Sequence, residues 1–159
     1  MGETTSIGVY DSFEVVIIER VAAKRLVRDY MPLGTRMPVY PTSLGRVLLA
    51  SQPEEEIDNY FKNVSLREIT PFTITDEKKL RDIIAETKVR GWVSTDRDMQ
   101  SDLRSVGVPI HDAQGKVAAA LNTNTLAHQL DIRHIEKNYV PVLLEVSAKI
   151  TNMIVHSGN

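Results

Sequence analysis

Apolar residues follow two different spacings along the chain, and together they predict a mixed α/β domain. Short runs rich in β-branched residues predict strands at 6–10 and 15–21, with a turn at residues 11–12 between them. The run at 15–21 is almost uniformly apolar, as expected for a strand that is covered on both faces. Residues 26–30 alternate apolar and polar side chains and predict a third strand beside these two. Two hairpin-connected strands followed by a third favour an antiparallel sheet over a doubly wound parallel one.

Helical spacing of apolar residues predicts three helices in the middle of the chain. The first runs from 44 to 50 and follows Thr42 or Ser43, either of which can cap its first turn. The second begins at Pro53, where a missing N–H costs nothing, and the third ends at Gly91. The residues expected to face the core are Ile57, Tyr60, Phe61 and Val64 in the second helix, and Leu80, Ile83, Ile84 and Val89 in the third.

The last third of the chain predicts a hairpin of strands and a long helix. Strands are expected at 92–95, 103–110 and 116–123, and the helix at 131–154. Pro109 inside a strand indicates that its nitrogen faces a free edge or a bulge, and Pro141 is expected to kink the helix or divide it. Small residues at 118–120 leave space for a closely packed helix or a cavity, and close packing is favoured. The expected fold is an α/β (α+β) domain with an antiparallel sheet flanked by helices.

Composition narrows the class of protein. The chain has 159 residues, the length of a single domain, with 42% hydrophobic and 25% charged residues, so a packed core is expected rather than disorder. A net charge of -2 argues against a surface that binds nucleic acid, which is normally basic. There is no cysteine and no apolar run near the roughly 20 residues that span a bilayer. We therefore expect a cytoplasmic protein without a membrane partner.

Candidate catalytic and metal-binding residues do not form a recognised pattern. The four histidines share no metal-ligand spacing, and Ser43 lacks the Gly-x-Ser-x-Gly context of a nucleophile. The carboxylates Asp96 and Asp98 are interpreted as part of a solvated loop, and those at 54–56 as the start of a helix. We expect no enzyme activity, no metal site and no cofactor, because no nucleophile and base occur together.

The start of the first helix is the strongest candidate for a binding site. An extended segment broken at Pro41 enters the helix at Thr42 and Ser43, so several unpaired N–H groups meet at the positive end of the helix. Such an arrangement suits an anion. An ordinary capped helix that binds nothing is the commoner case for this pattern alone.

Five segments in order resemble one known family. They are GTRMPVYPTSLGRVLLA at 34–50, preceded by ERVAAKRLVR at 19–28 and followed by GWVST at 91–95, DLRSVGVPI at 102–110 and GKVAAALN at 115–122. This series resembles the effector-binding domain of the IclR family of bacterial transcriptional regulators. The segment at 19–28 is similar to the subgroup that controls protocatechuate and β-ketoadipate catabolism.

The resemblance implies a GAF/profilin-like fold and a two-part design for the full-length protein. Members of the family carry an amino-terminal winged helix-turn-helix that binds DNA. We expect residues 1–159 to be a single effector-binding domain from which that DNA-binding part is missing. The resemblance therefore implies that this chain meets DNA only through the missing part, and that it forms a homodimer or tetramer.

The resemblance also implies a set of ligand-binding residues. They are Ser43 and Leu44 through their backbone N–H groups, Thr95, Ser105, Asn122 and Asn124. Some relatives have an aspartate in place of Thr95, small hydroxyl residues in place of both asparagines, and a smaller residue in place of Leu44. Thr95 suits an anionic ligand better than a carboxylate does. The asparagines are equally well explained by bonds to neighbouring strands.

A charged ligand also favours an arginine, since a guanidinium binds a carboxylate through two hydrogen bonds. The candidates are Arg20, Arg36, Arg46, Arg97 and Arg104, with Arg36 ranked first because it lies nearest the motif. The side chains considered for an aromatic wall are Tyr40, Met37, Met99 and Trp92, although such residues more often fill a core.

Two functional hypotheses follow. The first is a sensor for a small aromatic acid or dicarboxylic catabolite, of the class of protocatechuate, 4-hydroxybenzoate or β-ketoadipate, that controls DNA binding by the full-length protein. The second is a domain that mainly mediates oligomerisation and has no tight small-molecule ligand.

Overall fold

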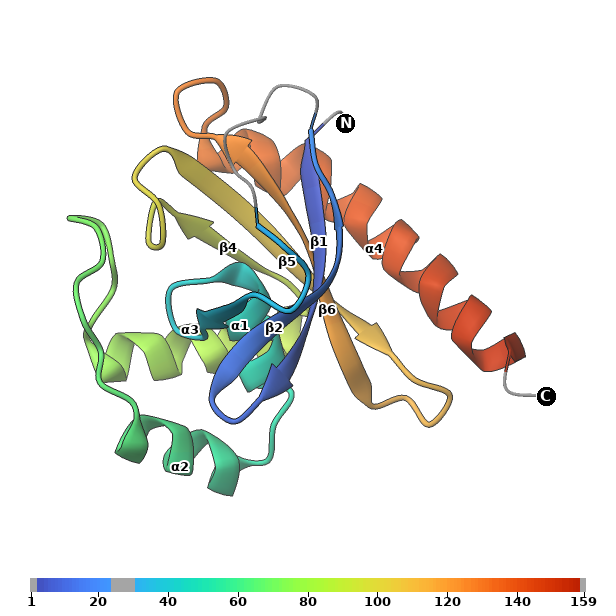
Figure 1. Ribbon diagram of the computed structural model, residues 1–159, viewed down its shortest axis with the longest axis horizontal. Coiled ribbons are helices and arrows are strands. Elements are labelled where there is room, and N and C mark those ends of the chain that lie inside the picture. The colour runs from blue at the N-terminus through green and yellow to red at the C-terminus, as the bar shows by residue number, and fades with distance from the viewer. Residues whose placement is uncertain (1–2, 24–30, 158–159) are drawn as a thin grey trace.

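The computed structural model describes residues 3–23 and 31–157, which form six strands and four helices (Figure 1). The strands are β1 (Thr4–Asp11), β2 (Glu14–Val21), β3 (Arg36–Pro38), β4 (Val93–Asp96), β5 (Leu103–His111) and β6 (Val117–Leu126). The helices are α1 (Ser43–Ala50), α2 (Glu54–Asn63), α3 (Glu77–Arg90) and α4 (Ile132–Ser157). The predicted strand at 26–30 lies outside the described residues.

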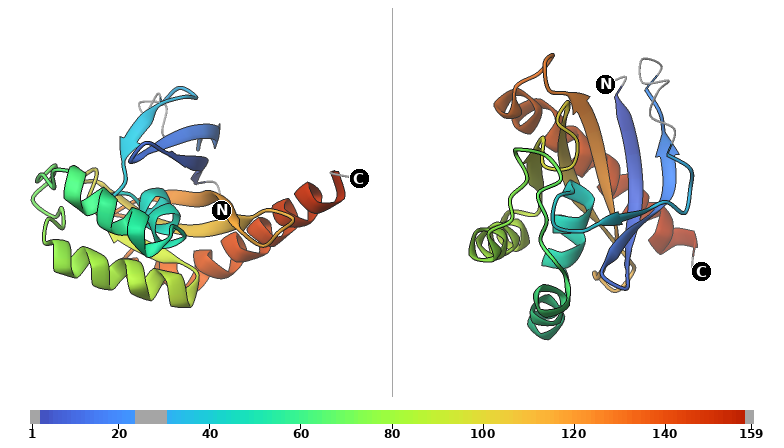
Figure 2. Two further views of the ribbon diagram at one scale, coloured as in Figure 1. Left: turned by 90° about the horizontal axis from the view of Figure 1, so that it is seen from below. Right: turned by 60° about the vertical axis from the view of Figure 1, so that its left-hand side comes forward.

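The described strands form one antiparallel sheet in the order β3-β2-β1-β6-β5-β4. The first strand of the chain therefore pairs with the last one, and this pairing joins the two halves of the sheet. The sheet is strongly curled. Helices α1, α2 and α3 lie on one of its faces, whereas α4 runs along the other (Figure 2). The predicted antiparallel sheet flanked by helices is confirmed.

Each face of the sheet has its own apolar core, because alternate residues of a strand point to opposite faces. Val15, Ile17 and Ala120 pack with the helices of one face. Val106 and Leu121 pack with α4 on the other. Asn122 and Asn124 are two and four residues after Ala120 on β6, so they point to the same face of the sheet, the one that carries α1. Ser105 of β5 pairs with Asn124 and therefore shares this face.

The prediction that strand 15–21 is covered on both faces is wrong. Ile18 is 47% exposed and Val21 is 66% exposed, while Val15 and Ile17 are buried. The reason is the position of α4, which contacts β4, β5 and β6 on its face of the sheet. The outward side of β2 therefore remains in contact with solvent.

The local signals for helix ends are confirmed. Thr42 caps α1 by accepting from the backbone N–H of Gly45, and Asp76 caps α3 in the same way through Lys79. Gly91 ends α3 in the left-handed conformation with a φ of 77°. Val89 was expected to face the core and is instead 90% exposed, because its position falls on the outer side of α3.

Both internal prolines are accommodated by neighbouring elements. β4 pairs with β5 only as far as Gly107, so Pro109 has β6 on one side and a free edge on the other. Ser147 of α4 donates a hydrogen bond to the carbonyl of Pro109, which satisfies part of this free edge. Pro141 lies inside α4 and does not divide it into two helices.

Helix α1 lies unusually close to the sheet. A Cβ atom added to Gly107 of β5 would stand 2.9 Å from the carbonyl oxygen of Ser43. Ala120 of β6 is fully buried beside the same helix. Close packing was expected at the small residues of β6, and it occurs at Ala120. Two residues further along the strand, at Asn122, the same face lines a cavity.

Candidate functional site

A cavity of about 60 Å³ lies between the start of α1, the inner face of the sheet and the loop that follows β4. Its walls come from segments far apart in the sequence, and they combine apolar and polar side chains. The lining residues are Ser6, Ile17, Arg20, Met31, Met37, Pro41, Thr42, Ser43, Leu44, Thr95, Asp98, Met99, Gln100, Leu103, Ser105, Asn122 and Asn124. Ten of these 17 residues are polar or charged, so the lining is more polar than that of most small-molecule sites.

The first turn of α1 supplies hydrogen-bond donors to this cavity. The Thr42 side chain accepts from Gly45 N, and the Thr42 carbonyl accepts from Arg46 N. Among the described residues, no acceptor serves the N–H groups of Ser43 and Leu44. The positive end of the helix dipole lies at the same point, so the site favours a negatively charged group.

Hydroxyl and amide groups form a connected network on the wall beside α1. Ser43 Oγ lies 2.6 Å from Ser105 Oγ, which donates to the carbonyl of Thr123 over 3.0 Å. Asn122 Nδ2 donates to both hydroxyl oxygens over 3.2 Å and to Asn124 Oδ1 over 3.4 Å. α1, β5 and β6 are therefore linked by polar contacts at the cavity wall.

Asp98 lies at the edge of the cavity but is engaged in an ion pair with Arg46 of α1. The Arg46 Nη2–Asp98 Oδ1 distance is 2.5 Å, and the two side chains are only 2% and 4% exposed. Arg46 Nε also donates to the carbonyl of Tyr40, and Asp98 Oδ2 accepts from the backbone N–H of Asp96. Burial lowers the pKa of the Arg46 guanidinium, while the charge of Asp98 opposes this shift.

The interpretation of 96–98 as a solvated loop is therefore wrong for Asp98. Asp96 is partly exposed and pairs with Arg97 and Arg104 over 3.0 and 2.7 Å. Partial burial alone raises the pKa of Asp96. Hydrogen bonds from Arg104 and Arg97 outweigh that effect, so the pKa lies below its usual value.

The structure brings to the cavity all six residues that the resemblance implies. They are Ser43, Leu44, Thr95, Ser105, Asn122 and Asn124. Tyr40 lies outside the lining set, and its hydroxyl donates to the carbonyl of Arg67 over 2.7 Å. Arg36 also lies outside this set. It lies on the edge strand β3, is exposed, and pairs with Asp11 and Glu14, the residues that flank the turn between β1 and β2.

Arg20 lines the cavity and is the one of the five candidate arginines that does so. Arg46 pairs with Asp98 in the loop after β4, and Arg97 and Arg104 pair with Asp96 at the end of β4. Met37 and Met99 line the cavity as considered, whereas Trp92 stacks under Arg90 with the guanidinium carbon 3.9 Å from the ring centre.

Some lining residues were not identified from the sequence, and Ser6 of β1 is an example. Ser6 reaches the wall because it pairs with Asn122 of β6 on one side and with Arg20 of β2 on the other. No local pattern marks Ser6. The pairing of the first strand with the last would have identified it, since it fixes which side chains share a face.

The described residues contain neither a metal-binding cluster nor a membrane-spanning helix. Within 3–23 and 31–157, no group of three or more His, Asp or Glu side chains is placed to hold a metal ion. In the same residues, every helix falls short of the length and hydrophobicity needed to cross a bilayer.

Comparison with protein families gives a match over nearly the whole chain. The family described as bacterial transcriptional regulator IclR C-terminal matches residues 1–152. The Pca regulon regulatory protein of Pseudomonas putida is 31% identical over 153 residues, which is 96% of this chain and 53% of that protein. The chain thus spans about half the length of this relative.

Solved structures give the same result for the fold. The inducer-binding domain of PobR from Acinetobacter, a double mutant in complex with 3-hydroxybenzoic acid, has a TM-score of 0.88 and 26% identity, and the match covers 97% of this chain and 90% of that one. The IclR protein of Thermotoga maritima has a TM-score of 0.87 and 30% identity, with 97% of this chain and 62% of that chain covered.

Proposed function

This chain belongs to the IclR family of bacterial transcriptional regulators, as their C-terminal effector-binding domain, and we propose that it binds a small organic acid in the cavity beside α1. The observation that carries this proposal is the meeting of two kinds of polar group at one partly enclosed cavity. Unpaired N–H donors at the start of α1 face the cavity that also holds the Ser43–Ser105–Asn122 network. The donors suit an acid group, and the network suits its polar substituents.

The proposed ligand class is a small aromatic acid or a dicarboxylic catabolite. The similarity to the Pca regulon protein and to a PobR domain complexed with 3-hydroxybenzoic acid supports this class. The cavity of about 60 Å³ is smaller than the 300–1,000 Å³ usual for ligand pockets. An aromatic acid therefore requires side chains to move, and Met31, Met37 and Met99 on the wall are flexible enough to do so.

Calorimetry with protocatechuate, 4-hydroxybenzoate and β-ketoadipate tests this function. Two variants at one position isolate the role of the helix start. Ser43→Pro removes the N–H and the hydroxyl, whereas Ser43→Ala removes the hydroxyl alone. Proline is tolerated at the first position of a helix, and the extended conformation of Thr42 is compatible with a following proline.

The expected result is that Ser43→Pro binds about 10-fold or more weakly than Ser43→Ala, since a hydrogen bond to a charged group contributes about 1.5–3 kcal/mol. Equal affinity of the two variants would remove the helix start from the site. An absence of heat with all three acids at millimolar concentration would contradict the proposed ligand class.

In the full-length regulator, the ligand would control DNA binding through a separate DNA-binding domain, as in other regulators of this family. The chain itself carries a net charge of -2, which does not favour direct contact with DNA. This role also places the domain in the cytoplasm and gives it no catalytic activity. Turnover of a small acid that is lost in Ser43→Ala would contradict the non-enzymatic assignment.

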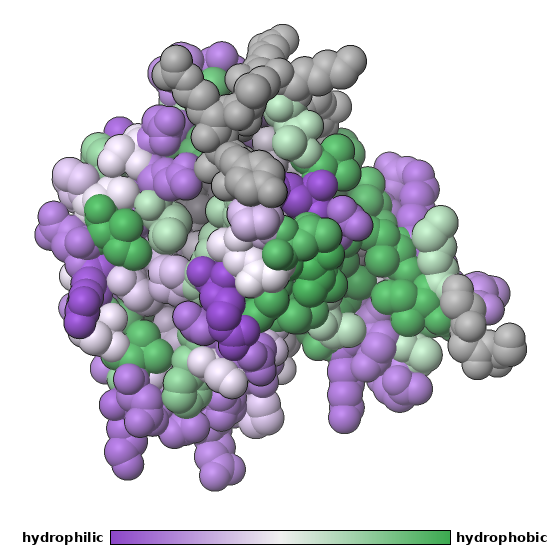
Figure 3. Space-filling model, in the orientation of Figure 1, coloured by the Kyte–Doolittle hydropathy of each residue, from purple (hydrophilic) through white to green (hydrophobic). Residues whose placement is uncertain are grey.

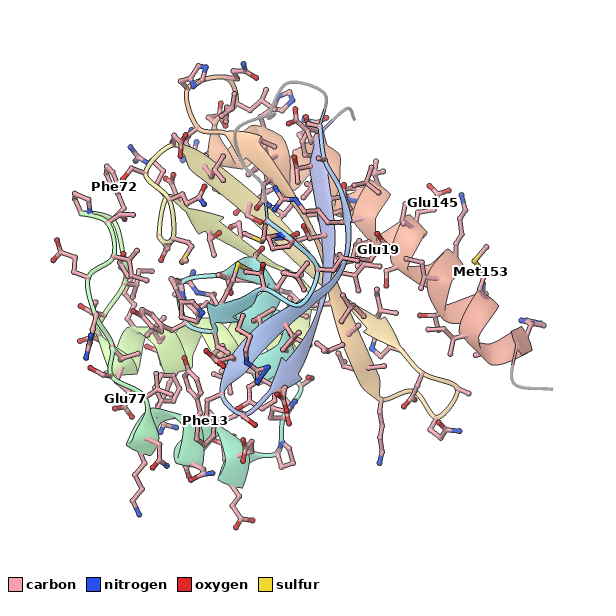
Figure 4. All side chains as sticks on the ribbon, in the orientation of Figure 1. Phe13, Glu19, Phe72, Glu77, Glu145 and Met153 are labelled. Carbon is pink, nitrogen blue, oxygen red and sulfur yellow. The ribbon has the colours of Figure 1, made fainter. Side chains whose placement is uncertain are left out.

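A second candidate function is oligomerisation, and it is favoured by the distribution of apolar surface. Figure 3 shows apolar side chains gathered over β2 and along α4. The exposed apolar residues of these two elements are Ile18, Val21, Val142, Leu144, Met153, Ile154 and Val155. Met153, for example, extends away from α4 and is 69% exposed (Figure 4). Apolar surface of this kind often marks an interface.

Light scattering tests this second candidate. If the surface over β2 and α4 joins two copies, Ile18→Lys and Leu144→Lys should shift the protein from dimer toward monomer. Val89→Lys is the matched control, because Val89 is 90% exposed on α3, away from this surface. A wild-type protein that stays monomeric at high concentration would contradict this interface.

A further inference from the structure

The side-chain oxygen of Asn122 is a buried acceptor at the cavity wall. Asn122 is 5% exposed, and its Oδ1 has no hydrogen-bond partner among the described residues. Asn122 also lines the cavity. Buried polar atoms are rarely left unpaired, because the loss of water has to be compensated by a new hydrogen bond. This oxygen therefore calls for a donor that comes from inside the cavity.

The hydrogen-bond network fixes the orientation of the Asn122 amide. A carbonyl can only accept, so the proton of Ser105 Oγ goes to the carbonyl of Thr123. The short contact of 2.6 Å to Ser43 Oγ then requires Ser43 to donate to Ser105. Both hydroxyl protons are thus committed, and both hydroxyl oxygens accept from Asn122 Nδ2. Rotating the amide would bring its oxygen against two oxygens without a free proton.

The wall consequently offers two different kinds of contact. The first turn of α1 offers donors, the N–H groups of Ser43 and Leu44. Asn122 Oδ1 offers an acceptor. An ionised acid group satisfies the donors but carries no proton for the acceptor. The acceptor requires a second group on the same ligand.

We propose that the effector is a hydroxy acid whose hydroxyl donates to Asn122 Oδ1, which makes Asn122 a residue that sets ligand specificity. This inference rests on the proposed function, namely that the cavity binds an organic acid. It divides the proposed ligand class, because protocatechuate and 4-hydroxybenzoate carry a hydroxyl while the keto group of β-ketoadipate can only accept. The cavity therefore prefers a ligand that places a hydroxyl next to Asn122 Oδ1 over one that places a hydrogen atom or a keto oxygen there.

Matched pairs of acids test the inference on the wild-type protein. Calorimetry compares 4-hydroxybenzoate with benzoate and malate with succinate, each pair differing by one hydroxyl. The hydroxy acid of the pair that binds should have a Kd about tenfold lower or more, because a site built to bond a hydroxyl disfavours an analogue that leaves its acceptor unpaired.

Two variants assign the preference to Asn122. Asn122→Leu keeps a similar volume without polar atoms and should bring the affinity ratio of the pair close to one. Thr125→Val is the matched control. Thr125 lies on the same strand with the opposite parity, is 1% exposed, and also has a buried unpaired oxygen, yet it does not line the cavity. It should retain the full preference.

The outcomes separate the inference from the function on which it rests. Equal affinity for both acids of a pair in the wild type would overturn the role of Asn122 while the organic-acid site stands. A preference that persists in Asn122→Leu would do the same. If no acid of either pair binds the wild type and the three pathway acids also fail, the proposed function fails and the inference fails with it.

Discussion

At the scale of single residues, the Arg46–Asp98 pair is the contact on which the geometry of the cavity most depends. It joins α1 to the loop after β4, and both of these segments line the cavity. Asp98 also accepts from Asp96 N and Ile74 N, so it organises the loop as well as neutralising the arginine. Removing one partner of a buried ion pair leaves an uncompensated charge in a medium of low dielectric constant.

Asp98→Ala should therefore lower the free energy of unfolding by about 3–5 kcal/mol. Urea denaturation followed by circular dichroism measures the change. Arg46→Met combined with Asp98→Leu removes both charges and should recover part of the lost free energy of unfolding. The part due to the N–H groups of Ile74 and Asp96, which would still lack the Asp98 carboxylate as an acceptor, should not be recovered. A single variant that loses less than about 1 kcal/mol would show that water reaches this pair.

Asp96 gives a dependence on pH whose sign follows from its environment. Hydrogen bonds from Arg104 and Arg97 hold the pKa of Asp96 in the folded state below its value in the unfolded chain. The stabilisation is therefore complete above the unfolded pKa, near 3.9, and is lost as the pH falls through the folded pKa. Because Asp96 is partly exposed, the amount should stay below about 1 kcal/mol.

Comparison of Asp96→Asn with wild type from pH 7 to pH 2.5 measures this contribution. The difference in the free energy of unfolding should be constant above about pH 5 and should shrink below about pH 4. A difference that grows on acidification would contradict the assigned direction of the pKa shift.

At the scale of elements, α1 is positioned by close backbone contacts more than by its side chains. A Cβ on Gly45 would stand 2.2 Å from the carbonyl oxygen of Val39. The turn before the helix thus folds directly against its first turn. All eight residues of α1 are buried, so the helix has no solvent-facing side that could absorb a shift.

Gly45→Ala should consequently destabilise the protein by more than about 2 kcal/mol, although the same change in an exposed helix gains up to about 1 kcal/mol. Thermal unfolding of Gly45→Ala against Ala85→Gly tests this reversal. Ala85 is an exposed position of α3, where loss of the methyl group should cost about 1 kcal/mol. A stabilised Gly45→Ala would show that α1 can move away from the sheet.

At the scale of the whole molecule, the two faces of the sheet are packed differently. One face packs against α4 over β4, β5 and β6, through Val106, Val108 and Leu143 among others. The other packs against α1 and keeps a cavity at the positions of Ser105 and Asn122. A ligand in that cavity would contact β1, β6 and α1 together, so its binding should stabilise the whole domain against unfolding.

Binding should therefore raise the free energy of unfolding of the whole domain. At a ligand concentration of 100 times Kd, the rise should be about 2.7 kcal/mol, because the ligand binds only the folded state. Urea denaturation with and without 4-hydroxybenzoate measures it. Ser43→Pro at the same concentration should show a smaller rise, and an equal rise in both proteins would indicate binding elsewhere.

The sequence alone determined the elements and their local signals. Caps at Thr42 and Gly91, the strands at 6–10 and 15–21 and the two apolar spacings depend on neighbours within a few residues. The turn between these strands lies at Ser12 and Phe13, one residue later than predicted. The resemblance then indicated six residues that the fold brings to one cavity. Only the tertiary structure decided how distant segments meet. In the folded chain Arg46 pairs with Asp98, and Ser6 lies opposite Asn122. Arg36 and Tyr40 lie outside the cavity and bond to other residues. The physical reason is that partners far apart in sequence leave no local pattern, so ion pairing and burial are settled when the sheet closes around its first and last strands.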